Sequence, residues 1–149
     1  MVAGAEDWPI FRGPNADGTT PETGWQTIWP ETGPDIAWEQ EVGIGCAGVV
    51  VQGDRVVTMG NRDEQDIVSC FHAGEGTLLW SYTYACVFEA RMFEGGTAAT
   101  PAIHDGRVYT VAYDGQVKCI NLESGELVWS THLIEDHGGR YPQWKYAGS

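Results

Sequence analysis

Two segments of the chain have almost the same amino-acid pattern. Residues 70–81 read CFHAGEGTLLWS, and residues 119–130 read CINLESGELVWS. The second copy follows the first at a spacing of 49 residues, because Cys70 corresponds to Cys119 and Trp80 to Trp129. A repeat of this period is typical of β-propellers and solenoids, in which one structural unit recurs along the chain. The repeat therefore limits the fold more strongly than composition does.

The repeat continues upstream, where residues 54–59 match residues 106–111. The first copy is three residues longer, and we expect the extra residues in a loose loop at 61–65. Gly-Asp and Asp-Gly pairs between β-branched runs predict hairpin turns, and Gly76 and Gly125 suit turns that need positive φ. Each unit is therefore predicted to contain four short strands. Their expected ranges are 47–52, 54–60, 66–72 and 77–84, then 98–103, 106–112, 116–121 and 126–133.

No part of the sequence has a sustained helical period, and 20 glycines and 7 prolines interrupt the chain. Residues 35–42 have the Trp-centred pattern of a fourth strand alone and are predicted to be the outer strand of a preceding blade. The expected fold is all-β: a partial β-propeller with two four-stranded antiparallel blades and this outer strand. A flat β-sandwich is the alternative, because two repeats do not establish closure into a ring.

The two copies resemble the tryptophan-docking motif of the pyrroloquinoline-quinone (PQQ) repeat. The opening residues 7–18, DWPIFRGPNADG, resemble the N-terminal signature of planctomycete-type PQQ-like proteins. The chain is therefore identified as a member of the PQQ-like β-propeller family, related to quinoprotein alcohol dehydrogenase-like propellers. The residues that carry the motif are Cys70, Gly76, Leu79 and Trp80, then Cys119, Ser124, Gly125, Val128 and Trp129. Further matches lie at 58–61, 93–96, 99–101 and 144–149.

The resemblance implies an eight-bladed ring, of which this chain is an N-terminal fragment. The expected parts are an N-terminal extension (1–34), the outer strand (35–42), blades at 47–84 and 98–133, and a loop into the next blade (134–149). The motif Trp is implied to pack between blades, against the glycine turn of the adjacent motif. The usual Asp of the motif is His72 in one copy and Asn121 in the other. The implied structural docking residues are Cys70, Gly76, Trp80, Cys119, Gly125 and Trp129.

The chain is strongly acidic, with 21 acidic and 8 basic side chains and a net charge of −13. Phosphate binding needs clustered Lys and Arg, so nucleic acid is excluded as an expected partner. No apolar run is long enough to span a membrane. The first residues lack the basic start and apolar centre of a signal peptide, but family resemblance implies a periplasmic or extracellular location.

The sequence predicts no metal site. Cys46, Cys70, Cys86 and Cys119 are widely spaced, which disfavours zinc, and their pairing is left open. Residues 15–18 and 63–66 offer oxygen ligands but lack the spacing of a calcium loop, so both are interpreted as solvated turns.

Two loops are the candidate binding surface, because each joins a fourth strand to the next blade and loops on a rigid scaffold commonly carry function. Both are expected on one face of the propeller and to form a pocket near its axis. The alternative is that they serve only as turns and packing. The candidate residues are Glu89, Arg91 and Glu94 in the first loop, and His137, Arg140 and Trp144 in the second.

The expected function is that of a non-catalytic, exported binding or assembly scaffold, which acts through its loop face on a protein or small ligand and packs against the remaining blades. The alternative is a PQQ- and calcium-dependent quinoprotein dehydrogenase that oxidises alcohols or sugars. A third interpretation is a structural module of a larger secreted protein. No catalytic residue or cofactor is assigned, and the vicinal Cys pair implied for alcohol-oxidising relatives does not occur here. Whether the full-length protein binds PQQ and calcium is left open.

Overall fold

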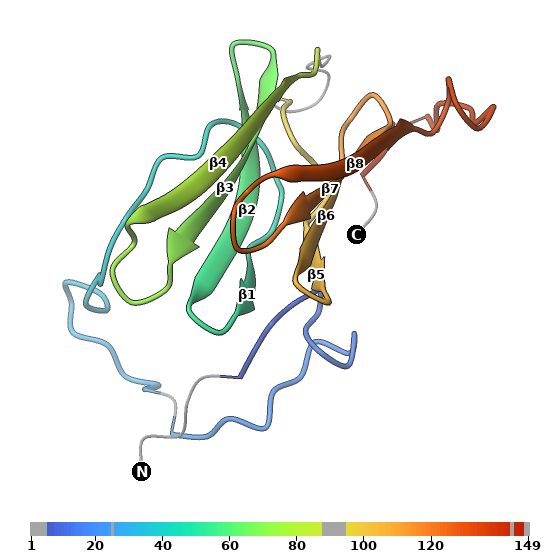
Figure 1. The fold of residues 1–149 in the computed structure, drawn as a ribbon. Coiled ribbons are helices and arrows are strands. Elements are labelled where there is room, and N and C mark those ends of the chain that lie inside the picture. Colours follow the sequence, from blue (N-terminus) through green and yellow to red (C-terminus); the bar gives the residue numbers. More distant parts are fainter. Residues whose placement is uncertain (1–5, 25, 88–94, 144, 148–149) are drawn as a thin grey trace.

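The computed structural model describes residues 6–24, 26–87, 95–143 and 145–147. Within these residues the chain is all-β and forms two four-stranded antiparallel sheets without a helix. The expected pair of four-stranded units is therefore confirmed (Figure 1). The first sheet contains β1 (Val50–Gln52), β2 (Arg55–Arg62), β3 (Gln65–His72) and β4 (Leu78–Ala85). The second contains β5 (Ala102–His104), β6 (Arg107–Val111), β7 (Gln116–Asn121) and β8 (Leu127–His132).

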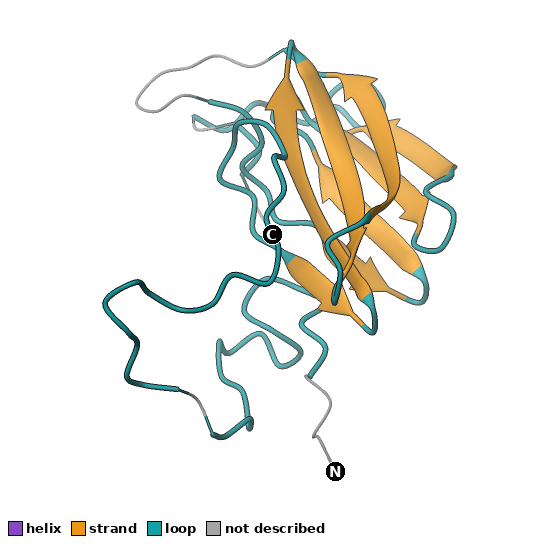
Figure 2. Cartoon of the chain, turned by 90° about the vertical axis from the view of Figure 1, so that its left-hand side faces the viewer, coloured by secondary structure: helices purple, strands orange, loops and turns teal. Residues whose placement is uncertain are grey.

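The strands of each sheet lie in sequence order, and the first strands of the two sheets, β1 and β5, lie against each other. The N-terminal segment joins these two strands: the Trp8 and Val51 backbones exchange two hydrogen bonds, and Ile103 N donates to Pro9 O. Figure 2 shows the strands as one block, with the segment before β1 running as a loop beside it. This arrangement places the β1 and β5 edges together and leaves β4 and β8 on the outside.

The core lies between the facing surfaces of the two sheets. Directly opposed residues on neighbouring strands point to the same face, so Val57, Cys70 and Trp80 form one buried row across the first sheet. Val108 and Ile120, which are also directly opposed, form the buried row of the second sheet that meets it. These side chains belong to one hydrophobic cluster, which means that neither sheet buries its apolar face alone.

Trp80 fills a turn of the second sheet. Its side chain is only 9% exposed, and its indole Nε1 donates to Leu122 O at 2.8 Å. A Cβ atom at Gly125 would lie 2.7 Å from the indole ring, and Gly125 has a φ of +73°. Both the close approach and the backbone conformation therefore require glycine at this position.

Trp38 makes the same contact with the first sheet. Its Nε1 donates to Ala73 O at 2.8 Å, and a Cβ atom at Gly76 would lie 2.5 Å from its ring. The predicted strand at 35–42 is not formed, however, because no described segment lies beside it to complete a hydrogen-bonded ladder. This segment is instead held by side chains, which include the Gln40 amide donating to Gly76 O.

The glycine turns keep their hydrogen bonds although the motif Asp is absent. In the first copy, His72 Nδ1 accepts from Glu75 N at 3.2 Å. In the second, Asn121 Oδ1 accepts from the backbone N–H groups of Glu123 and Ser124 at 2.9 and 3.0 Å. A ring nitrogen and an amide oxygen thus replace the carboxylate as turn acceptors.

The β2–β3 connection differs from the predicted loose loop at 61–65. The extra residues of the first copy lengthen β2 and β3 to 8 residues each, and Asp63 and Glu64 alone form the turn. Both have positive φ, 53° and 58°, as a type I′ hairpin turn requires. Glu is a poor residue for this conformation, because its Cβ clashes with the backbone. The prediction was wrong because Glu64, unlike the Gly that usually follows Asp in such a turn, is no signal for positive φ.

Substitution of Trp80 by Ala tests whether the indole holds the two sheets together. We expect Trp80→Ala to lower the free energy of unfolding by about 3–5 kcal/mol, the cost of removing a large buried aromatic side chain. Trp129→Ala is the matched control, since Trp129 is 45% exposed and its loss should cost far less. Urea titrations followed by circular dichroism would measure both, and equal losses would contradict the docking role of Trp80.

Substitution of Glu64 by Gly tests for strain in the β2–β3 turn. We expect Glu64→Gly to raise the free energy of unfolding by about 1 kcal/mol, because glycine adopts positive φ without a Cβ clash. Glu75→Gly is the control, since Glu75 lies in an exposed turn without positive φ and should gain nothing. A lower urea midpoint for Glu64→Gly than for the wild type would show that the turn is unstrained.

Candidate functional site

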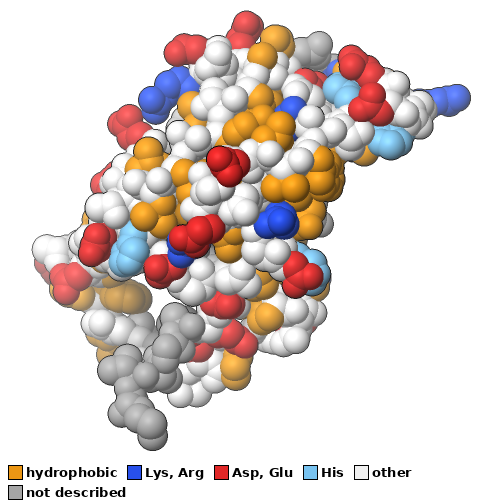
Figure 3. All heavy atoms as spheres, viewed as in Figure 1, with side chains coloured by type: hydrophobic (Ala, Val, Ile, Leu, Met, Phe, Trp, Pro, Cys, Tyr) orange, Lys and Arg blue, Asp and Glu red, His pale blue; other side chains and the backbone are white. Residues whose placement is uncertain are grey.

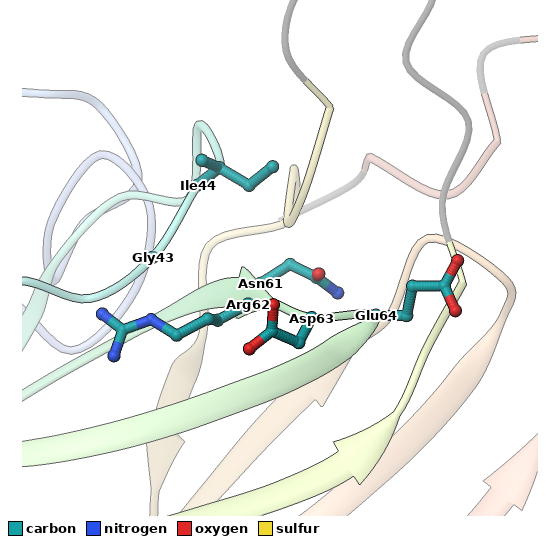
Figure 4. Close-up of a pocket in the computed structure, with 6 residues that line it drawn as sticks. All are labelled: Gly43, Ile44, Asn61, Arg62, Asp63 and Glu64. Atoms are coloured by element: carbon teal, nitrogen blue, oxygen red, sulfur yellow. The ribbon is translucent and has the colours of Figure 1, made fainter.

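The β2–β3 turn and the end of β4 lie at one end of the first sheet, since Gln65 pairs with Ala85. We call this the loop end. An open hollow of about 420 Å³ is found there (Figure 4). Figure 4 shows Asn61, Arg62 and Asp63 side by side along the end of β2 and its turn, with Ile44 on a separate segment. The lining residues are Gly43, Ile44, Asn61, Arg62, Asp63 and Glu64.

The wall of the hollow is built by close backbone contacts. Ile44 and Asn61 exchange backbone hydrogen bonds of 2.9 and 2.8 Å, and Thr97, which pairs with Gly45, donates from Oγ1 to Met59 O. Gly60 is needed for this packing, because a Cβ atom there would lie 1.9 Å from Val42 O. The segment before β1 is therefore fixed against β2, which positions Ile44 at the rim.

A row of polar side chains lies behind the hollow. Asn61, Asp66 and Tyr84 are directly opposed on β2, β3 and β4, so they share the face that packs on the second sheet. The Asn61 side-chain amide donates to Asp66 Oδ1 at 2.7 Å and to Cys86 O at 3.0 Å. Asp66 is 1% exposed, and this burial raises the pKa of its carboxyl above the ordinary value, opposed by the hydrogen bond from Asn61.

Cys86 and Tyr84 belong to the same buried region. Burial, together with the nearby Asp66 carboxylate, raises the pKa of the Cys86 thiol to about 12. The same two causes, burial first, raise the pKa of Tyr84. The thiol is thus held protonated at neutral pH and is a poor nucleophile. All four cysteines are free, with Cys46 exposed and Cys86 buried.

The sequence interpretation of 63–66 as a solvated turn holds for Asp63 and Glu64, which are exposed, but is wrong for Asp66. Asp66 lies inside β3 at a position that faces the core, so its burial follows from the alternation of the expected strand at 66–72, which the interpretation of 63–66 as a turn overlooked. In the other turn, Asp17 Oδ1 accepts two hydrogen bonds from Thr19. No cluster of three or more His, Cys, Asp or Glu suited to a metal is found among the described residues.

The predicted loop pocket is only partly visible. Its residues Glu89, Arg91, Glu94 and Trp144 lie outside the described residues. His137 and Arg140 are described and exposed, and neither is among the described residues that line the hollow. His137 Nε2 instead lies 2.9 Å from Thr131 Oγ1, which donates to Asp136 Oδ2 at 2.9 Å. The described hollow is thus lined by residues that the sequence analysis had not selected, and the loop pocket stays a prediction.

The buried carboxyl of Asp66 makes stability depend on pH. Because its pKa is raised in the folded protein, the folded state holds a proton that the unfolded state loses above its pKa of 3.8. The contribution of Asp66 to stability therefore falls as pH rises above that value. We expect Asp66→Asn to be stabilised relative to the wild type by an amount that grows from pH 4 to pH 7.

The measurement is a urea titration at several pH values. The control is Asp63→Asn, which removes the same charge from an exposed position on the neighbouring turn. A gap between Asp66→Asn and wild type that stays constant with pH, or equals that of Asp63→Asn, would show that burial of Asp66 has no electrostatic cost.

Solved structures provide one comparison with known proteins. BamB from Moraxella catarrhalis is 18% identical, with a TM-score of 0.49 over 64% of this chain and 26% of that one. A quinohemoprotein alcohol dehydrogenase from Pseudomonas putida is 21% identical, with a TM-score of 0.49 over 67% of this chain and 15% of the other. A europium-containing methanol dehydrogenase is 18% identical, with a TM-score of 0.45 over 57% and 15%. The chain thus spans about a quarter or less of the length of these proteins.

A family model gives the second comparison, and no curated protein sequence matches the chain. The model is described as outer membrane protein assembly factor BamB, and it matches residues 17–139. The match includes both four-stranded sheets and the segment that carries Trp38. The chain therefore belongs to the PQQ-type, BamB-like family of β-propeller proteins.

Proposed function

We propose that the chain is part of a non-catalytic, exported propeller that binds a partner protein through its loop end. The observation that carries this proposal is the open hollow, which has a fixed backbone wall and an exposed rim. Loops held by a rigid sheet are common places for binding. The family description, an assembly factor, agrees with a scaffold that works by contact. A periplasmic or extracellular location is proposed with it.

The rim indicates what the partner presents. Ile44 is 36% exposed and supplies an apolar surface, while Asp63 and Glu64 supply two carboxylates to the lining of the same hollow. Arg62 lies 3.9 Å from Glu41, so its charge is partly balanced. The protein as a whole carries a net charge of −13. A segment with an apolar side chain next to Lys or Arg complements this rim, and nucleic acid does not.

Further blades are proposed as the second kind of partner. Trp38 and Trp80 each lie on a glycine turn, whereas Trp129 is 45% exposed and has only Tyr109 as an aromatic neighbour among the described residues. In Figure 3, hydrophobic side chains gather over this part of the second sheet. We propose that Trp129 docks on a glycine turn of the next blade and that residues 35–42 pair with a strand of another. A ring of eight blades is the size that the family resemblance implies.

A quinoprotein dehydrogenase is the second candidate. One feature favours it: the Asp66 carboxyl, with its raised pKa, lies behind a hollow, which suits an acid or base. Against it, the four cysteines are isolated in sequence, so this chain alone supplies no vicinal pair to stack on a quinone. PQQ and calcium would have to be held largely by residues of a longer protein.

Photo-crosslinking tests the proposed partner surface. A photoreactive phenylalanine analogue is placed at Ile44 or Glu64 in the protein expressed in cells of its source organism. We expect a discrete crosslinked protein from both rim positions. The control is the same analogue at Glu75, an exposed residue of the glycine turn beside Trp38. Crosslinks from Glu75 alone, or equally from all positions, would contradict binding at the loop end.

Titration of the full-length protein with PQQ and calcium separates the two candidate functions. For the scaffold we expect no saturable change in the absorbance of the quinone. Stoichiometric binding that Asp66→Asn weakens, while Asp63→Asn does not, would favour the dehydrogenase.

A further inference from the structure

The buried polar row behind the hollow continues across the junction of the two sheets. It consists of Asn61, Asp66, Tyr84 and Cys86 from the first sheet and its end, and Thr110 on β6 of the second. We call these residues the junction cluster. The Tyr84 hydroxyl and the Cys86 thiol face Asp66, and Thr110 faces the Tyr84 hydroxyl. Asn61, Asp66 and Thr110 are each 1% exposed, so bulk water does not solvate their side chains.

The junction cluster has too few hydrogen bonds for its polar atoms. Among the described residues, Tyr84 has only weak polar contacts with Asp66 and Thr110, and four buried oxygens make no hydrogen bond of good geometry: Asn61 Oδ1, Asp66 Oδ2, Tyr84 Oη and Thr110 Oγ1. Each buried group left without a partner costs about 1–3 kcal/mol, and native proteins satisfy the great majority of such groups. Four in one place therefore indicate a missing partner.

Neighbouring charged side chains are already engaged. Lys118, opposite Thr110 on β7, donates from Nζ to Gln116 Oε1 at 2.9 Å and lies 4.9 Å from the centre of the Tyr84 ring. Asp114 accepts from the Gln116 backbone and side-chain amides through its two oxygens. Both groups are thus held by Gln116, whose amide also donates to Ala85 O. Neither makes a hydrogen bond to any of the four oxygens.

We propose that the junction cluster is a binding site for internal water that bridges the two sheets. Two of the four atoms, Asn61 Oδ1 and an ionised Asp66 Oδ2, only accept hydrogen bonds, while the Tyr84 and Thr110 hydroxyls both donate and accept. Water supplies two donors and two acceptors, which matches this set. Buried water of this kind typically makes about three hydrogen bonds to groups that lack protein partners.

The position of Asn61 connects this site to solvent. Asn61 belongs to the junction cluster and also lines the open hollow, so the proposed water would lie near the hollow at this residue. The contact between the sheets is then apolar around Trp80 and Val57 and hydrated at the loop end. A bound water can change its hydrogen-bond partners, so side chains at the loop end could shift without leaving an empty cavity between the sheets.

A crystal structure at about 1.5 Å resolution tests the proposal directly. We expect a water peak about 2.7–3.2 Å from at least two of the four oxygens, including Thr110 Oγ1 or Tyr84 Oη. Direct hydrogen bonds from Asp66 through Tyr84 to Thr110, with no density between them, would overturn it. A peak with contacts of about 2.3–2.6 Å to several oxygens would overturn it as well, since that is the calcium range.

Thr110→Val provides the test in solution. The substitution keeps the shape of the side chain and removes only the hydroxyl. If the hydroxyl binds water, the variant loses that bond, and we expect its melting temperature to fall by about 2–4 °C. A rise would overturn the proposal, because removing a truly unpartnered buried hydroxyl is stabilising. Thr83→Val is the control, since Thr83 is exposed on β4 and its hydroxyl should contribute little.

Discussion

The packing of an indole into a glycine turn is the contact on which the arrangement of the sheets depends. Each sheet is thin and exposes an apolar face, so it is stable only when a neighbour covers that face. Trp80 covers the boundary and ties its ring nitrogen to Leu122 O in the next sheet. Gly125 allows the ring to approach, because any Cβ there would overlap it. The indole of Trp80 and the lack of a side chain at Gly125 thus together set the spacing of the two sheets.

The same contact explains why the motif tolerates change at its polar position. The turn must present a glycine in a left-handed conformation, and it needs an acceptor for its free N–H groups. His72 and Asn121 provide that acceptor with different chemistry. The requirement is for a lone pair at the right place, not for a carboxylate. The steric requirement for glycine has no such substitute.

The sequence predicted the repeat unit well because strand and turn signals are local. The spacing of Cys70 and Cys119, and of Trp80 and Trp129, defined both sheets, and the strand bounds agree within a few residues. Two features could not be read in this way. The turn at Asp63 and Glu64 places a Glu in a conformation that it disfavours, and the interpretation of 63–66 as a turn hid the burial of Asp66. A core carboxyl was therefore taken as a solvated one, although the expected strand at 66–72 includes it.

The candidate site depends on contacts between distant segments, which no local pattern reports. Ile44 reaches the hollow because its backbone pairs with Asn61, 17 residues later. Asn61 then joins the rim to the buried Asp66 through its side-chain amide. A polar row at the end of an otherwise apolar face, together with a strained turn, costs stability that apolar residues would not. Such costs are commonly found at functional positions, which is why the loop end, and not the Trp-filled interior, is where we place binding.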